Sequence, residues 1–98
     1  MEIKKEIEGS TMKLKVSGRM DTNTAPDVEE AIKESIDGIT ELIIDFSDLD
    51  YISSAGLRVL LSAQKRMNEQ GSMVITGVSE PIMEIFDVTG FSDILTIQ

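Results

Sequence analysis

The sequence contains neither cysteine nor histidine. Without cysteine there is no disulfide framework, no thiolate nucleophile and no zinc–thiolate site. Without histidine the chain lacks the usual general base and the commonest metal ligand. One tyrosine and three phenylalanines are too few to form stacking platforms for nucleic acid bases. We therefore expect a protein that is not an enzyme and that holds no cofactor and no metal.

Basic residues are also scarce, with nine lysines and arginines against eighteen acidic residues and a net charge of −9. A surface of this sign repels phosphate backbones and anionic lipids, so nucleic acid is not an expected partner. No apolar run approaches the roughly 20 residues of a membrane span, and the N-terminus is too polar for a signal peptide. These features predict a cytoplasmic protein without direct membrane insertion, whose partner is a protein with a basic patch.

The length of 98 residues fits a single domain spanning residues 1–98. Unbroken alternation of apolar and charged residues over 12–16 predicts a half-exposed strand, joined to residues 2–8 by a tight hairpin at Gly9-Ser10. The remaining elements expected are a helix from Thr24 to a stop at Gly38, a strand over 42–46, a helix over 54–70, a strand over 72–76, a short helix from Pro81 to about Gly90 and a strand over 94–97.

The order β-β-α-β-α-β-α-β predicts an α/β fold, a mostly parallel mixed sheet with helices packed on it. The start of the first helix resembles a capping box, with Thr24 followed three residues later by Asp27 and with Pro26 in the first turn. The strand over 42–46 is nearly continuous in apolar residues, which is typical of a strand covered on both faces.

In open α/β sheets, functional residues gather at the carboxyl ends of parallel strands. The segment DLDYISSAG, residues 48–56, leaves such a strand and enters the second long helix. If Ser53 is the N-cap, Ile52 and Leu57 form a hydrophobic staple, whereas a cap at Ser54 pairs Ser53 with Arg58 and staples nothing. We therefore assign the cap to Ser53 and the first helical position to Ser54.

At that first position the Ser54 hydroxyl is not needed for capping. Ala55 and Gly56 follow, and we expect these small residues to let another protein approach the hydroxyl closely. An anion at a helix N-terminus is stabilised by free N–H groups and by the helix dipole. Ser54 is therefore predicted to be a modification site.

Three segments, FSDLDYISSAGLRVLL, GRMDTNTAPDVEEAI and SEPIMEIFDVTGFSDIL, together resemble the STAS domain, specifically the bacterial anti-sigma factor antagonists. The resemblance covers nearly the whole chain and implies a small α/β fold. It also implies that the unphosphorylated form binds an anti-sigma factor that is itself a serine protein kinase, so that a sigma factor is released. ATP-dependent phosphorylation by this kinase would end the complex, and a PP2C-like phosphatase would reverse the modification.

The family motif is commonly Asp-Ser-(Ser/Thr)-Gly-Leu, with the serine after the aspartate phosphorylated. Aligned through Gly56-Leu57, the motif places the phosphorylated serine at Ser54 and puts Ser53 where the family has aspartate. An aspartate that precedes the first helix in the family matches Asp21, in a loop expected beside Ser54. The partner-binding residues implied are Asp21, Thr22, Ser53, Ser54, Ala55, Gly56 and Arg58.

Other interpretations remain open at this point. The chain could be an accessory STAS subunit of an ABC-type transport complex, in which Ser54 need not be modified. A phosphoaspartate receiver using Asp45 is less well supported, because the expected acidic pair and late lysine are missing. The acidic residues Asp45, Asp48 and Asp50 lack the glycine and distal glutamate of a calcium-binding loop, which favours solvated carboxylates.

Overall fold

Alternation along the strands decides which side chains enter the core. In the computed structural model, which describes residues 1–98, Met12, Leu14 and Val16 are fully buried while Lys13 between them is exposed. The elements are β1 (Glu2–Glu8), β2 (Thr11–Met20), α1 (Ala25–Lys33), β3 (Glu41–Asp45), β4 (Leu49–Ile52), α2 (Ser54–Gln70), β5 (Ser72–Thr76), α3 (Glu80–Thr89) and the 3₁₀ turn η1 (Phe91–Asp93).

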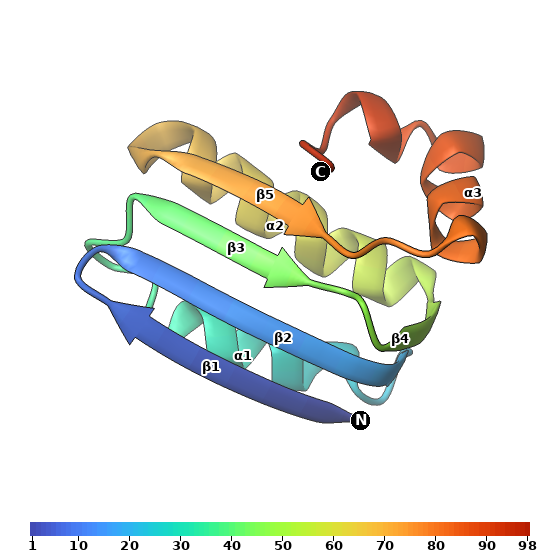
Figure 1. Cartoon of the computed structure of the whole chain (residues 1–98), viewed down its shortest axis with the longest axis horizontal. Coiled ribbons are helices and arrows are strands. Elements are labelled where there is room, and N and C mark those ends of the chain that lie inside the picture. Colours follow the sequence, from blue (N-terminus) through green and yellow to red (C-terminus); the bar gives the residue numbers. More distant parts are fainter.

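The strands form a mixed sheet in the order β1-β2-β3-β5, and β4 also pairs with β2. The β1–β2 pair is antiparallel and turns at Gly9-Ser10, as predicted, whereas β2–β3, β3–β5 and β2–β4 are parallel. The first half of β2 lies beside β3 and its last residues lie beside β4 (Figure 1). The predicted α/β class with a mostly parallel mixed sheet is confirmed.

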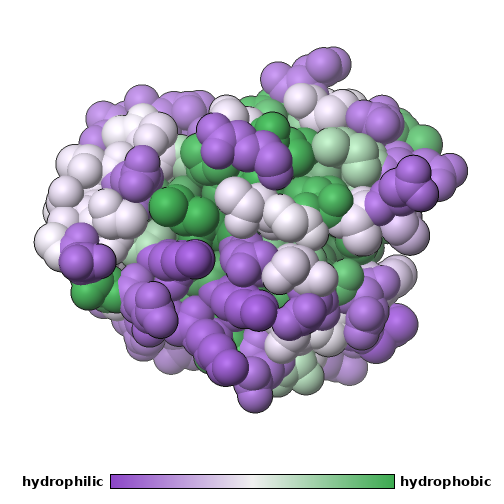
Figure 2. Space-filling view, viewed as in Figure 1, coloured by the Kyte–Doolittle hydropathy of each residue, from purple (hydrophilic) through white to green (hydrophobic).

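Helices α1 and α2 cover one face of the sheet, and α3 lies at the end of β5 (Figure 1). The buried hydrophobic side chains form one cluster of 24 residues contributed by every strand except β1 and by all three helices. The opposite face of the sheet carries no helix, and Figure 2 views this face. It is hydrophilic over β1 and β2 and more hydrophobic toward β5. No helix is both long and apolar enough to span a bilayer.

The first helix ends earlier than predicted, at Lys33 instead of near Gly38. The ammonium group of Lys5 on β1 donates hydrogen bonds to the Ala31 carbonyl at 3.1 Å and to the Ser35 hydroxyl at 2.9 Å, which satisfies groups at the helix end.

The predicted capping box is wrong. The Thr24 hydroxyl turns back and donates to the Arg19 carbonyl at 2.7 Å instead of capping α1.

Two further segments differ from the sequence prediction. Residues 49–52 form strand β4, although we expected the whole segment 48–56 to be a loop leading into α2. The strand expected over 94–97 is not formed as such. Gly90 and η1 turn the chain, Leu95 N–H bonds back to Phe91, and only residues 96–98 reach the edge of β5, through a single bridge between Ile75 and Ile97.

The close approach of two chain segments at Gly71 predicts a large stability effect. A Cβ atom there would lie 2.0 Å from the Thr40 carbonyl oxygen, a backbone atom that cannot rotate away. We expect Gly71→Ala to lower the free energy of unfolding by about 3 kcal/mol, at the upper end of overpacking costs. Urea denaturation measures the change.

Gly38 is the matched control, because its φ of +84° is unfavourable for alanine but nothing lies within 4 Å of the added carbon. Gly38→Ala should cost only about 1 kcal/mol. Equal losses in the two variants would show that the contact with Thr40 does not govern the effect.

Candidate functional site

The carboxyl end of β2 is joined to the start of α2 by strand pairing. Met20 lies opposite Ile52 in the parallel β2–β4 pair, and the Ser53 N–H donates to the Met20 carbonyl at 2.9 Å. Asp21 follows Met20 directly, so its loop and the Ser53-Ser54 turn form one end of the molecule. The two loops are therefore neighbours, as expected, and backbone hydrogen bonding between β2 and the start of α2 holds them there.

Ser53 caps α2 as predicted. Its backbone is extended, and its hydroxyl accepts a hydrogen bond from the Gly56 N–H at 3.3 Å. Ile52 and Leu57, the predicted staple pair, are 3% and 7% exposed. Ser54 is therefore the first residue of the helix, and its side chain is exposed.

Gly56 is small for a reason internal to the fold. It is buried, and a Cβ atom there would lie 2.7 Å from Cγ1 of Ile52 and 3.1 Å from Cγ of Met20. The glycine thus lets α2 begin directly against the β2–β4 pair. These contacts explain the glycine without the expected need to clear space for an approaching protein. Ala55, by contrast, is partly exposed beside Ser54.

The Asp21 carboxylate organises its own loop with one of its oxygens. Oδ1 accepts hydrogen bonds from the Thr24 N–H at 3.1 Å and the Asn23 N–H at 3.0 Å, and the Thr24 hydroxyl oxygen lies 3.1 Å away while its proton goes to the Arg19 carbonyl. The Thr24 N–H contributes most to holding the pKa of Asp21 below its usual value, and partial desolvation opposes the shift. Oδ2 accepts none of these bonds and pairs with Nε of Arg19 at 3.9 Å.

Arg19 and Tyr51 also belong to this end of the molecule, although sequence reasoning did not select them. They face each other across the β2–β4 pair, and the guanidinium carbon of Arg19 lies 4.3 Å from the centre of the Tyr51 ring. Both side chains are exposed. No sequence signal pairs them, because their contact depends on β4, which reads as a loop.

Thr22 and Arg58 are both exposed. Arg58 lies four residues after Ser54 on α2, hence one turn further along the same face, and it forms no ion pair within the chain. The predicted partner-binding residues therefore fall in the Asp21 loop and in the first turns of α2, with Gly56 alone buried among them.

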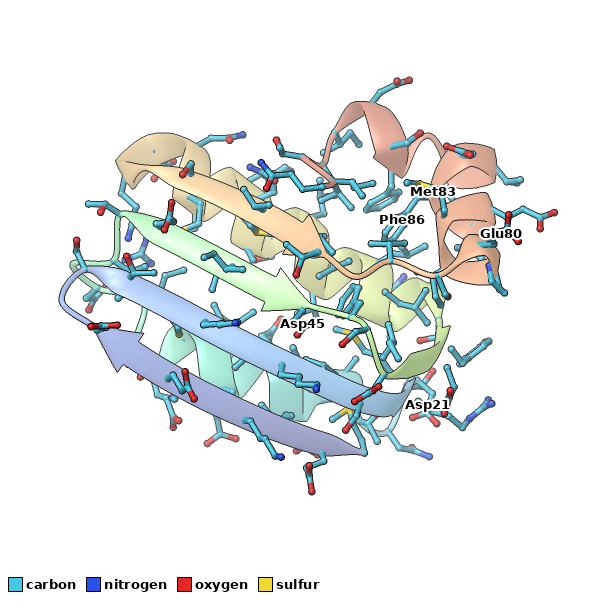
Figure 3. All side chains as sticks on the ribbon, viewed as in Figure 1. Asp21, Asp45, Glu80, Met83 and Phe86 are labelled. Carbon is cyan, nitrogen blue, oxygen red and sulfur yellow. The ribbon has the colours of Figure 1, made fainter.

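The acidic residues after β3 serve local structure. Asp45 Oδ1 accepts the Ser47 N–H at 2.8 Å, and this bond lowers the pKa of Asp45. Asp48 pairs with Lys15 at 3.1 Å, and this hydrogen bond raises the pKa of Lys15. Asp45 projects from the sheet at the end of β3, apart from Asp21 (Figure 3). No three acidic side chains come together in a metal-binding arrangement.

Comparison with known proteins identifies relatives that share this architecture. The STAS domain family profile matches residues 2–98. The anti-sigma-B factor antagonist of Listeria monocytogenes is 35% identical over 97 residues, which cover 96% of this chain and 84% of the relative.

Two solved structures have the same fold. An anti-sigma factor antagonist from Mycobacterium paratuberculosis superimposes with a TM-score of 0.88 at 23% identity, covering 98% of this chain and 83% of that one. The Bacillus cell fate determinant SpoIIAA in its phosphorylated form gives a TM-score of 0.78 at 17% identity, covering 99% and 91%. With its β2–β4 junction, its capped α2 and these matches over nearly its full length, the chain belongs to the STAS domain family of anti-sigma factor antagonists.

Proposed function

We propose that this protein is a phosphorylation-switched antagonist of an anti-sigma factor that is also a serine kinase, working in the cytoplasm. The unphosphorylated form binds the kinase and frees a sigma factor. Phosphorylation of Ser54 makes the complex dissociate, and a PP2C-like phosphatase removes the phosphate so that the protein can bind again. The observation that carries the proposal is the exposed Ser54 at the first position of α2, held beside the Asp21 loop by the β2–β4 pair.

In the kinase step, the Ser54 oxygen attacks the γ-phosphorus of ATP. The bond between the γ-phosphorus and the β–γ bridging oxygen breaks, and ADP leaves. The serine proton passes to a base, which we assign to the kinase because protein kinases carry such a group in their catalytic loop. The chain contributes the nucleophile and its placement. The product phosphate lies at the helix N-terminus, where free N–H groups and the dipole stabilise an anion.

The same charge that the helix N-terminus stabilises would repel acidic groups of the partner that face Ser54. Phosphorylation adds about −1.5 to −2 charges. A unit like-charge contact near 4 Å costs about 4 kcal/mol at an effective dielectric of 20, which corresponds to roughly a thousandfold loss of affinity. The switch can therefore act at the interface without refolding the domain.

The relatives support this function at the level of family. The Listeria relative is an anti-sigma-B factor antagonist, and SpoIIAA is known in a phosphorylated form on the same fold. The phosphorylated serine is assigned here to Ser54 because Ser53 is occupied as the cap of α2.

Substitution of Ser54 tests the switch. The partner is first obtained by affinity capture from native cell lysate with Ser54→Ala as bait, and phosphate sites are mapped on the wild-type protein. We expect Ser54→Ala to bind the captured kinase as tightly as the unmodified protein and to resist phosphorylation. Ser54→Asp and the authentic phosphoprotein should bind about 100 to 1000 times more weakly, as measured by calorimetry.

Ser62→Asp provides the matched control, because Ser62 is an exposed serine on the same helix two turns away. This variant should retain binding. Undiminished binding of the phosphoprotein, or phosphate found only on Ser53, would contradict the proposal. Capture of an ABC ATPase in place of a sigma-regulating kinase would instead indicate a transport subunit.

The two oxygens of Asp21 predict separable effects. Asp21→Asn keeps an acceptor oxygen for the Asn23 and Thr24 N–H groups but removes the charge offered by Oδ2, whereas Asp21→Ala removes both. We expect the asparagine variant to lose partner affinity with little change in melting temperature, and the alanine variant to lose both. Calorimetric titration and thermal melting of the two variants distinguish the effects.

The pKa of Asp21 also sets the sign of its pH dependence. Because the folded-state pKa is depressed, the stabilisation from this loop is present above the unfolded value near 3.8 and is lost as the pH falls through the lower folded value. The stability gap between the wild type and Asp21→Ala should therefore close on acidification. A gap that widens at low pH would contradict the hydrogen-bonded loop.

A further inference from the structure

Helix α3 has one face in the core and another that nothing covers. Ile82 and Phe86 on the inner face are 1% and 0% exposed. Phe86 and Met83 point toward the rest of the domain, whereas Glu80 points outward (Figure 3). The helix is thus firmly seated, and its outer side chains are presented on a rigid element.

The outer face carries an apolar stripe. Pro81, Ile85 and Val88 follow one another at i, i+4 and i+7, the spacing of a single helix face. Val88 is 81% exposed, more than any other large hydrophobic side chain, the next being Ile7 at 49%. The stripe borders a shallow hollow of about 410 Å³ lined by Pro81, Glu84, Ile85, Val88 and Thr89.

The segment that carries the stripe contains charges of one sign. All nine lysines and arginines lie between residues 4 and 66, and residues 67–98 contain none. The same stretch contains five acidic residues: Glu69, Glu80, Glu84, Asp87 and Asp93. An apolar stripe in this setting repels a second copy of itself and repels anionic lipid or nucleic acid, and it attracts a cationic apolar surface.

We propose that the outer face of α3 docks a cationic amphipathic helix of a protein partner. The apolar residues of that helix fill the hollow beside Ile85 and Val88, and its lysines or arginines meet Glu84 and the acidic residues on the next face of α3. None of Ser53–Gly56 lines the hollow, so this contact does not need the Ser54 hydroxyl. The inference therefore stands independently of the function proposed above.

A defined peptide serves as the probe. It is a 16-residue amphipathic helix with leucines at i, i+4 and i+7 spacing flanked by lysines, compared with a twin in which every lysine is glutamate. In ¹⁵N–¹H spectra of the full chain, the lysine peptide should shift amides of residues 80–89, and its affinity should fall about tenfold or more between 50 and 500 mM salt. The glutamate twin should cause no shifts.

Two surface variants make the test specific. Val88→Ser and Glu84→Lys change exposed side chains, so folding is retained, and each should weaken the peptide about tenfold. The matched control is Ile7→Ser, which removes the exposed apolar side chain of β1 and should leave affinity unchanged.

Several outcomes would overturn the proposal. These are peptide shifts centred outside α3, equal binding of the two peptides, or an equal loss in the Ile7→Ser control. Concentration-dependent shifts of α3 amides without peptide would identify a second copy of the chain as the occupant and would equally refute it.

Discussion

The candidate site depends on the parallel pairing of β2 with β4. Three residue pairs, from Gly18 with Leu49 to Met20 with Ile52, place the Asp21 loop against the start of α2. The buried Gly56 allows the helix to begin in contact with this pair, and the Ser53 N–H fixes the junction through the Met20 carbonyl. Without this short strand, Asp21 and Ser54 would belong to separate loops of uncertain spacing.

The sequence was most informative where local chemistry decides the structure. The cap at Ser53, the apolar pair Ile52 and Leu57, and the helix over 54–70 follow from nearest-neighbour preferences, and all are present. The apolar run over 42–46 and the alternation over 12–16 likewise predicted strands, because burial on one or both faces leaves a direct pattern in the residues.

The missed features depend on contacts between distant segments. Strand β4 has acidic neighbours and only four residues, and it is a strand because the end of β2 offers it unpaired backbone groups. The Arg19–Tyr51 contact follows from that pairing and could not be read from either residue alone. The bond that Lys5 donates to Ala31 at the early end of α1 is another such contact, between residues 26 positions apart in the chain.

Electrostatics divides the surface into two regions of different character. The Ser54 end combines Asp21 with Arg19 and Arg58, two of the chain's three arginines, so the partner proposed to bind there would meet charges of both signs. Helix α3 carries only acidic charged residues beside its apolar stripe, and the partner proposed for it is cationic. The net charge of −9 is therefore unevenly distributed: the Ser54 end has charges of both signs, whereas α3 has acidic charges alone.

Strand β2 has two separate pairings, and the β2–β4 ladder contains a bulge between Gly18 and Arg19. Residues 11–15 of β2 are held against β3, while only the last three pair with β4. The β2–β4 ladder has three residue pairs against five in the β2–β3 ladder, so we expect local opening to cost less at this end than in the main sheet. For the phosphorylation proposed at Ser54, the consequence is that the segment entering a kinase would be the part of the sheet held by the fewest pairs, while the longer ladders keep the domain folded.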